Sequence, residues 1–191
     1  KNSSCELVEK RSRFIARAYH VTNEDEALSV LNEIRTTCWD ASHNVFAYII
    51  RKNNIARFSD DGEPSKTAGP PVMDVLSRGG LCDCLVVVTR YFGGTLLGVG
   101  GLVKAYGSSA KMAVDAAGVA VMTLCCRYRC RLPYSDWGKF QNVIKGIGAT
   151  LEKTDFTDVV ETEVCISKDM SEKLISEITE QFNDTIKPEE E

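Results

Sequence analysis

The chain has 191 residues, of which 43% are hydrophobic, and a formal net charge of −4. A chain of this size can enclose one large core or two small ones, and its acidic balance is unlike the basic body of a dedicated nucleic-acid-binding domain. Because no run of about 18 apolar residues and no apolar leader is present, we expect a cytoplasmic protein without a membrane span or secretory signal.

The first half of the sequence alternates between strand and helix patterns. Apolar residues alternate along 13–19 and form a continuous β-branched run over 84–92, and they recur at helical spacing after Thr22 and after Leu102. Thr22 and Asp25 resemble a capping box, and Pro70 and Pro71 suit the first turn of a helix, where N–H groups have no partner. The expected elements are strands over 13–19, 44–51, 55–58 and 84–92, and helices over 27–34, 72–78 and 102–117.

A second unit begins near Thr123, where strict strand alternation restarts. Its expected elements are a strand over 125–132, a helix capped by Ser135, strands over 149–156 and 159–166, and a helix capped by Asp169. This β-α-β-β-α order lacks one strand of the ferredoxin-like pattern. We expect residues 184–188 to form a stub of that strand before an acidic, disordered end. The predicted domains are 1–123 and 124–191.

The stretch RFSDDGEPSKTAGPP, residues 57–71, concentrates three carboxylates in a segment that fits neither helix nor strand. Two unit charges about 6 Å apart repel by roughly 3 kcal/mol at an effective dielectric near 20, so these carboxylates should converge only around a cation such as Mg²⁺. An Asp-Gly turn with helix caps uses the same residues without a ligand, and we favour it. The acidic loop comprises Asp60, Asp61, Gly62 and Glu63, and Lys66 and Thr67 are candidate phosphate contacts.

The second candidate site is GGTLLGVGG, residues 93–101, between a predicted strand and a predicted helix. This order suits anion binding by backbone N–H groups. The loop does not match the Walker A motif of nucleotide-binding proteins, because Val99 and Gly100 stand where that motif has Lys and Ser or Thr. It does not match the G-x-G-x-x-G motif of dinucleotide-binding proteins either, because Val103 stands where the third glycine should be. Two alternatives remain. The loop binds phosphate through its backbone N–H groups without a nucleotide motif, or its glycines are needed only for positive φ angles and close packing. The candidate residues are Arg90, Gly93, Gly94, Thr95, Gly98, Gly100, Gly101 and Lys104.

Other reactive residue types give weaker indications. Arg127, Arg129 and Arg131 share one strand face, which is either a solvated sheet face or a secondary strip for a polyanion. The eight cysteines lack the paired spacing of zinc sites, so we interpret those near apolar strands as small buried residues. His43 is interpreted as a hydrogen-bonding residue at the start of a strand. We assign no catalytic or metal-binding residue.

Four separated motifs resemble the YigZ/IMPACT family in order and spacing: SRFIA, HNVFAY, SDDGEPSKTAG and VVVTRYFGGTLLGVGGLVKAYG. The likeness covers about residues 10–120. The unit from 127 to 191 resembles the bacterial C-terminal domain of that family, which is similar to the last domain of elongation factor G. Two positions depart from the family motif: Lys66 replaces a glycine and Pro70 replaces a basic residue.

The resemblance implies an α+β protein: a ribosomal-protein-like α/β sandwich followed by a smaller ferredoxin-like domain. Eukaryotic relatives act in translational control, so it also implies a non-enzymatic, translation-associated regulator. Such a regulator would bind RNA or a ribosome or translation-factor surface through a cleft between the acidic loop and the glycine loop. One alternative is a Mg²⁺-dependent enzyme acting on a nucleotide or another phosphorylated molecule. Another is a protein-interaction adaptor that uses Tyr91 and Phe92.

Overall fold

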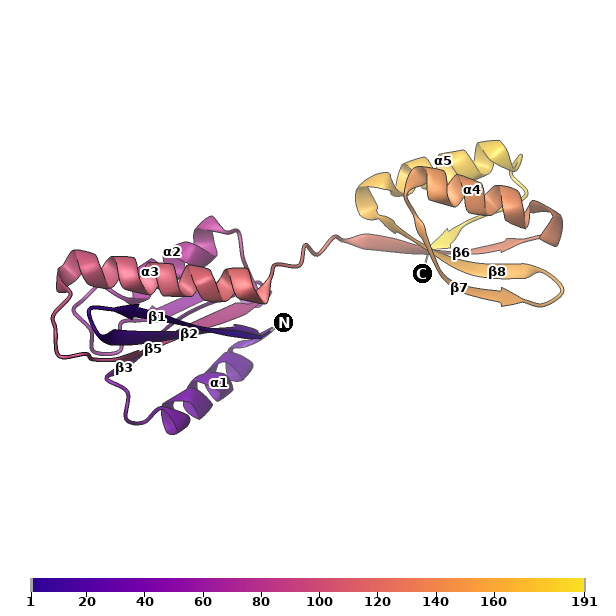
Figure 1. Cartoon of the computed structure of the whole chain (residues 1–191). Coiled ribbons are helices and arrows are strands. Elements are labelled where there is room, and N and C mark those ends of the chain that lie inside the picture. Colours follow the sequence, from indigo (N-terminus) through magenta and orange to yellow (C-terminus); the bar gives the residue numbers. More distant parts are fainter. Residues whose placement is uncertain (1, 191) are drawn as a thin grey trace. The chain divides into compact units, whose positions relative to one another are not determined.

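The computed structural model describes residues 2–190 and divides the chain into two compact units, 1–120 and 121–191. The predicted boundary, between 123 and 124, lies three residues further along the chain. Each unit pairs an antiparallel sheet with helices, which confirms the α+β class (Figure 1). Among the described residues, no helix has the length and apolar character needed to span a membrane.

The first unit contains a five-stranded sheet in the order β1-β2-β5-β3-β4, with every pairing antiparallel. Its strands are β1 (Ser3–Glu9), β2 (Ser12–His20), β3 (His43–Ile50), β4 (Ile55–Ser59) and β5 (Cys84–Tyr91). The central strand β5 is covered on both faces, which explains its continuous run of β-branched residues.

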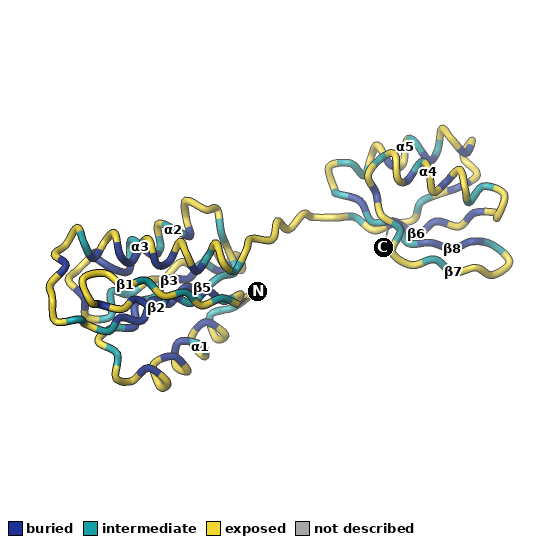
Figure 2. The backbone as a smooth tube through the Cα atoms, in the orientation of Figure 1, coloured by how far each residue is buried: buried dark blue, intermediate teal, exposed yellow. Residues whose placement is uncertain are grey.

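Helices cover the two faces of this sheet (Figure 1). They are α1 (Glu24–Thr37), α2 (Gly69–Arg78) and α3 (Gly98–Ala117). Val86 and Val88 of β5 pack in the core under α2 and α3, whereas Leu85 and Val87 pack in the core under α1. Figure 2 shows buried positions along the sheet-facing sides of these helices. The result is the expected sandwich of a sheet between helices.

Three local predictions for the first unit are corrected by the structure. Asn23, rather than Thr22, caps α1, because its side chain accepts the N–H of Glu26 at 2.9 Å. Helix α3 begins at Gly98, four residues before the predicted start, because Gly100 and Gly101, which suggested a loop, belong to its first turn. Strand β1 was not predicted because its short alternating pattern is rich in polar residues.

The second unit has a four-stranded sheet in the order β7-β8-β6-β9, which confirms the ferredoxin-like arrangement. Its elements are β6 (Cys125–Leu132), α4 (Trp137–Ile147), β7 (Thr150–Phe156), β8 (Val160–Ser167), α5 (Ser171–Gln181) and β9 (Glu189–Glu190). Both helices lie on one face of the sheet (Figure 1) and enclose a core that includes Tyr128, Phe140 and Leu174.

The second unit also corrects four predictions. Neither Ser135 nor Asp169 caps a helix, because each lies in a 3-10 turn that precedes α4 or α5. The final strand is Glu189–Glu190 instead of a stub at 184–188. Glu189 and Glu190, which we expected to be disordered, therefore pair with β6, where Glu189 lies opposite Arg129, and the last residue of the expected disordered end lies outside the described residues.

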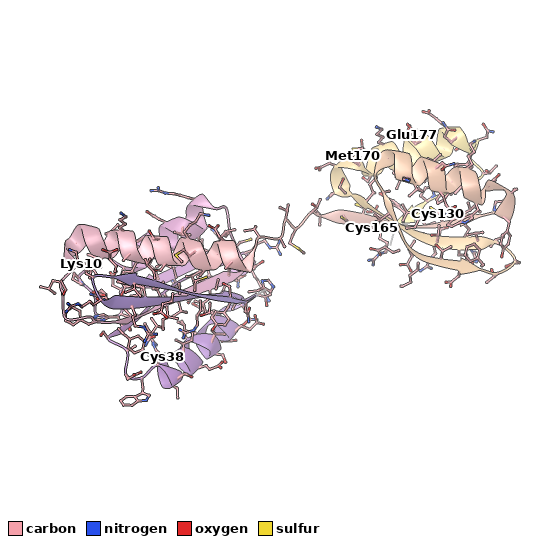
Figure 3. The ribbon with its side chains drawn as sticks, in the orientation of Figure 1. Lys10, Cys38, Cys130, Cys165, Met170 and Glu177 are labelled. Atoms are coloured by element: carbon pink, nitrogen blue, oxygen red, sulfur yellow. The ribbon has the colours of Figure 1, made fainter. Side chains whose placement is uncertain are left out.

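The cysteines fit the buried interpretation only in part. Cys38 lies in the core on the α1 side of the first sheet, and Cys130 lies in the core of the second unit (Figure 3). Burial raises the pKa of Cys130 to about 12, so its thiol is inert at neutral pH. Cys82 and Cys125 are exposed, contrary to our expectation, because Cys82 lies in the loop before β5 and Cys125 is the first residue of β6.

Candidate functional site

The carboxylate of Asp60 organises the loop that follows β4. It accepts hydrogen bonds from the backbone N–H groups of Lys66 (2.8 Å), Ala68 (3.0 Å) and Gly69 (2.8 Å). Because Gly69 begins α2, Asp60 satisfies N–H groups at that helix end and complements its dipole. Lys66 has a φ of 65°, so it keeps a left-handed turn where the family motif has glycine.

Asp61 connects the acidic loop to the start of β3. Its Oδ2 accepts the backbone N–H of Asn44 at 2.6 Å, and its carbonyl oxygen lies 2.8 Å from Nδ1 of His43. Because a carbonyl oxygen only accepts, Nδ1 of His43 donates this hydrogen bond, and Nε2 on the other side of the ring lies 3.8 Å from Oε1 of Glu63. The interpretation of His43 as a hydrogen-bonding residue at the strand start is confirmed.

Glu63 is the centre of a buried ion pair. Its Oε1 accepts hydrogen bonds from Nη1 of Arg90 at 2.6 Å and from the hydroxyl of Tyr106 at 2.7 Å. The side chains of Glu63 and Arg90 are only 3% and 7% exposed, so water solvates neither charge to any large extent. Burial, reinforced by the hydrogen bond to Glu63, raises the pKa of Tyr106 far above its usual range, which keeps this hydroxyl a donor.

The three carboxylates of the acidic loop therefore have separate partners. Asp60 binds backbone N–H groups, Asp61 binds the start of β3, and Glu63 binds Arg90 and Tyr106. No group of three His, Cys, Asp or Glu side chains within the part of the chain that the structure describes could hold a metal ion. This arrangement corresponds to the turn-and-cap alternative, in which the carboxylates are used by the fold itself.

The glycine loop splits into two parts with different physical roles. Gly93 lies against the backbone between β1 and β2, where an added Cβ would be only 2.1 Å from the carbonyl carbon of Arg11. Gly94 and Gly98 have positive φ angles of 80° and 74°. Gly98 also begins α3, and Gly100 and Gly101 belong to the first turn of that helix.

The acidic and glycine loops face one cleft of about 450 Å³ beside the C-terminal end of β5. This location agrees with the prediction drawn from the order of strand, glycine loop and helix. Polar atoms come from few side chains, and aliphatic or aromatic groups form most of the wall. The lining residues are His43, Gly62, Glu63, Pro64, Arg90, Phe92, Leu96, Leu97, Gly98, Val99 and Leu102.

The structure brings only part of the predicted anion site into this cleft. Arg90 and Gly98 line it, but the guanidinium of Arg90 is already paired with Glu63. The hydroxyl of Thr67 is buried and donates to the carbonyl of Pro64 at 2.6 Å. The remaining candidates are outside the lining: Lys66, Gly93, Gly94, Thr95, Gly100, Gly101 and Lys104.

The sequence reasoning missed the apolar character of the cleft. Leu96 and Val99 are 81% and 66% exposed, and Phe92 beside them is also exposed. The sequence contained a hint of this exposure, because apolar side chains in a glycine-rich surface loop have no hydrophobic core to pack into. For the adaptor alternative, Phe92 is exposed as expected, whereas Tyr91 is half-buried and its hydroxyl donates to Asp40 at 3.2 Å.

The arginine strip of the second unit lies on the exposed sheet face and is matched by acidic residues. Arg127 contacts Glu152 at 2.7 Å, and Arg131 contacts Glu161 at 2.5 Å. Arg129 lies opposite Glu163 on β8 and Glu189 on β9. Cross-strand pairs of opposite charge stabilise a sheet and reduce its local positive potential. The strip thus has the arrangement of a solvated, charge-paired face.

Replacing Asp60 by alanine is expected to lower the unfolding free energy of the first unit by about 2 kcal/mol, because three backbone N–H groups lose a charged acceptor. Thermal unfolding would measure this loss. Lys66→Gly is the matched control: it keeps the N–H bonded to Asp60 but relieves a left-handed φ, so we expect it to be neutral or slightly stabilising. Equal stability of Asp60→Ala and the wild type would contradict the proposed role of Asp60.

Comparison with known proteins gives matches to both units. Residues 10–114 match the Impact N-terminal domain, and residues 130–185 match a domain of unknown function, DUF1949. IMPACT family member YvyE of Bacillus subtilis is 36% identical over 179 residues, which cover 93% of this chain and 82% of that protein. IMPACT family member YigZ of Escherichia coli is 40% identical over 108 residues, covering 55% and 53%. The crystal structure of a hypothetical protein is 26% identical, covers 98% of this chain and 92% of that one, and has a TM-score of 0.61.

Proposed function

Since this chain belongs to the YigZ/IMPACT family, we propose that it is a translation-associated regulatory protein that acts without catalysis, by docking onto a protein of the translation machinery. The docking site is the cleft between the acidic and glycine loops. The translational role rests on the family resemblance, and the docking role rests on the surface around the cleft.

The observation that carries the docking role is the exposed apolar rim formed by Phe92, Leu96 and Val99. These side chains line a concave surface, and an exposed apolar patch beside polar residues is typical of a protein-interaction site. Burying them against a partner would remove apolar area from water at about 25 cal/mol per Å².

The charge distribution favours a protein over RNA as the docking partner. RNA binding would require cations free to contact phosphates, but Arg90 is buried against Glu63 and the strip on β6 is matched by glutamates. Lys66 and Lys104 remain exposed, and they lie outside the cleft lining. Two exposed lysines on an acidic chain provide little attraction for a polyanion.

The test is co-sedimentation of the full chain with a purified fraction of ribosomes and translation factors. Leu96→Asp places a charge on the rim at a residue that is 81% exposed, so the fold should persist while recovery falls at least tenfold. Leu28→Asp on α1 is the matched control, because Leu28 is also an exposed leucine, 45% accessible, but lies outside the cleft. It should sediment like the wild type.

A salt series separates protein docking from RNA binding. Docking through apolar contacts should change little with salt, whereas neutralising about three phosphates on a single strand would give a log-log slope near −2. In the RNA case, the double variant Lys66→Ala, Lys104→Ala should flatten that slope by about one to two units. Full recovery of Leu96→Asp together with the steep slope would replace our proposal by RNA binding.

A further inference from the structure

The turn between β1 and β2 holds two cations in a backbone conformation that disfavours them. Lys10 and Arg11 form a two-residue loop between Glu9 and Ser12, which pair across the two strands. Their φ angles are 46° and 68°, as in a type I′ turn, for which Asn-Gly is preferred because most side chains disfavour a left-handed backbone. The chain therefore keeps two cations at this turn although other residues would make it more stable.

The fold itself does not use these two side chains. Both are exposed, and neither forms an ion pair or a hydrogen bond within the described part of the chain. The exposed Arg13 and Arg35 of the same unit differ in this respect, because Arg13 pairs with Glu6 at 2.7 Å and Arg35 pairs with Asp61 at 3.5 Å. A strained backbone whose side chains have no folding partner points to a role in binding.

The turn lies beside the cleft. A Cβ at Gly93 would be 2.1 Å from the carbonyl carbon of Arg11, so the turn and the glycine loop touch through their backbones. Phe92, which precedes that glycine, lines the cleft. Figure 3 shows Lys10 at the end of the first unit where α3 begins.

Two exposed lysines flank the cleft from other elements. Lys66 lies two residues after a lining proline, and Lys104 lies on α3 two residues after a lining leucine. Neither forms an ion pair with another described residue. Within the turns that surround the cleft, the exposed carboxylates are Glu9 and Asp40, and the latter accepts the hydroxyl of Tyr91. The cleft is thus surrounded by an excess of positive charge, on a chain whose net charge is −4.

The walls and the cations together favour an acidic protein segment over RNA. Leu96, Leu97 and Val99 provide aliphatic surface for an apolar side chain, whereas single-stranded RNA requires aromatic rings for its bases. The four cations belong to three separate elements, so they match carboxylates on either side of an apolar anchor better than a continuous row of phosphates. Charge complementarity of this kind adds specificity and a faster encounter to apolar docking.

We propose that the cleft and the cations around it bind an acidic segment of a partner protein. Apolar side chains of that segment occupy the cleft, and the flanking carboxylates contact Lys10, Arg11 and Lys104. The inference rests on the proposed docking function and names the chemistry of the partner segment.

The experiment titrates the full chain with the peptide acetyl-Asp-Glu-Phe-Glu-Glu-Leu-Asp-amide and follows backbone amide signals by NMR. We expect saturable shifts at Arg11, Phe92, Leu96 and Val99, with a dissociation constant on the order of 0.1–1 mM for so short a ligand. Two matched peptides test the two halves of the proposal. One has alanine in place of Phe and Leu, the other has lysine in place of every acidic residue, and each should bind at least tenfold more weakly.

Salt and an RNA probe distinguish this segment from a polyanion. Raising the salt concentration from about 50 to about 500 mM should weaken binding of the acidic peptide by less than about fivefold, because exposed ion pairs are screened but a short peptide releases no condensed counterions. A slope near −2 would instead give about a hundredfold loss. A seven-residue oligouridine should bind more weakly than the acidic peptide at either concentration.

The sharpest variant replaces the turn by its preferred sequence. Lys10→Asn, Arg11→Gly should raise the thermal unfolding midpoint by a few degrees, because both residues suit positive φ angles, and should weaken the acidic peptide about fivefold. A gain in stability with a loss of binding separates a binding role from a structural one.

A charge-reversed pair provides the matched control. Lys10→Glu should bind the acidic peptide at least fivefold more weakly than the wild type. Lys52→Glu makes the same charge change at an exposed lysine that follows the far end of β3, whereas His43 at the start of that strand lines the cleft. It should bind like the wild type.

Four results would overturn the inference: no shift with the acidic peptide at several millimolar, equal binding of the acidic and lysine peptides, wild-type binding by the Asn-Gly variant, or tighter binding of oligouridine. Each is distinct from failure of the proposed function. If Leu96→Asp still prevents co-sedimentation in those cases, the rim remains a docking surface for a partner segment that is not acidic.

Discussion

Replacing Glu63 by alanine is expected to lower the unfolding free energy of the first unit by about 3–5 kcal/mol, because the guanidinium of Arg90 would be left buried without its counter-charge. The hydroxyl of Tyr106 would lose its acceptor in the same step. Hydrogen exchange of β5 amides in the full chain measures this loss, and amides of β8 in the second unit serve as an internal reference that should not change.

Two further variants distinguish the effect of breaking the buried ion pair from the effect of removing any single charge. The double variant Glu63→Met, Arg90→Met removes both charges and fills the space, so it should regain a large part of the stability that Glu63→Ala loses. Asp74→Ala breaks an exposed ion pair of α2 with Arg78 at 3.6 Å and should change stability by less than about 1 kcal/mol. If Glu63→Ala and Asp74→Ala had similar effects, the buried pair would not be a main support of the fold.

Gly93→Ala is expected to destabilise the first unit by about 3 kcal/mol or more, since its Cβ would overlap backbone atoms rather than a movable side chain. The added carbon would lie 2.1 Å from the carbonyl carbon of Arg11 and 2.4 Å from the backbone nitrogen of Ser12. Relief would require separating β5 from the turn between β1 and β2. Urea denaturation followed by circular dichroism would measure the loss.

Gly100→Ala is the control from the same loop. A Cβ at Gly100 meets no atom within 4 Å, and the residue belongs to α3, so alanine should stabilise the helix by about 0.5–1 kcal/mol. Opposite signs for the two substitutions would support our division of the glycine loop into a close-packed part and a helical part. Equal destabilisation by both would show that the loop requires glycine for another reason.

Local patterns in the sequence were enough to predict most of the architecture. Residue periodicity depends on near neighbours in the chain, so it identified the buried strand β5, the apolar stripe of α3 and the restart of strand alternation at β6. The order of β5, glycine loop and α3 also predicted the end of the sheet at which the cleft lies. The family motifs led to the same two-unit organisation.

The chemistry inside the cleft was decided by tertiary structure alone. Arg90 and Glu63 are 27 residues apart in sequence and meet only because β5 lies between β2 and β3, with the acidic loop at the same end of the sheet. From the sequence, Arg90 was a candidate cation for phosphate, and Glu63 was either a Mg²⁺ ligand or, in the alternative we favoured, part of an Asp-Gly turn. Pairing them in a buried site removes both roles, because each charge is stabilised by the other in place of a ligand. What remains open to a partner is the apolar wall and the uncapped start of α3. The glycine-rich loop hinted at exposed apolar residues, but only the fold shows that Phe92, Leu96 and Val99 line one cleft and that α3 begins there.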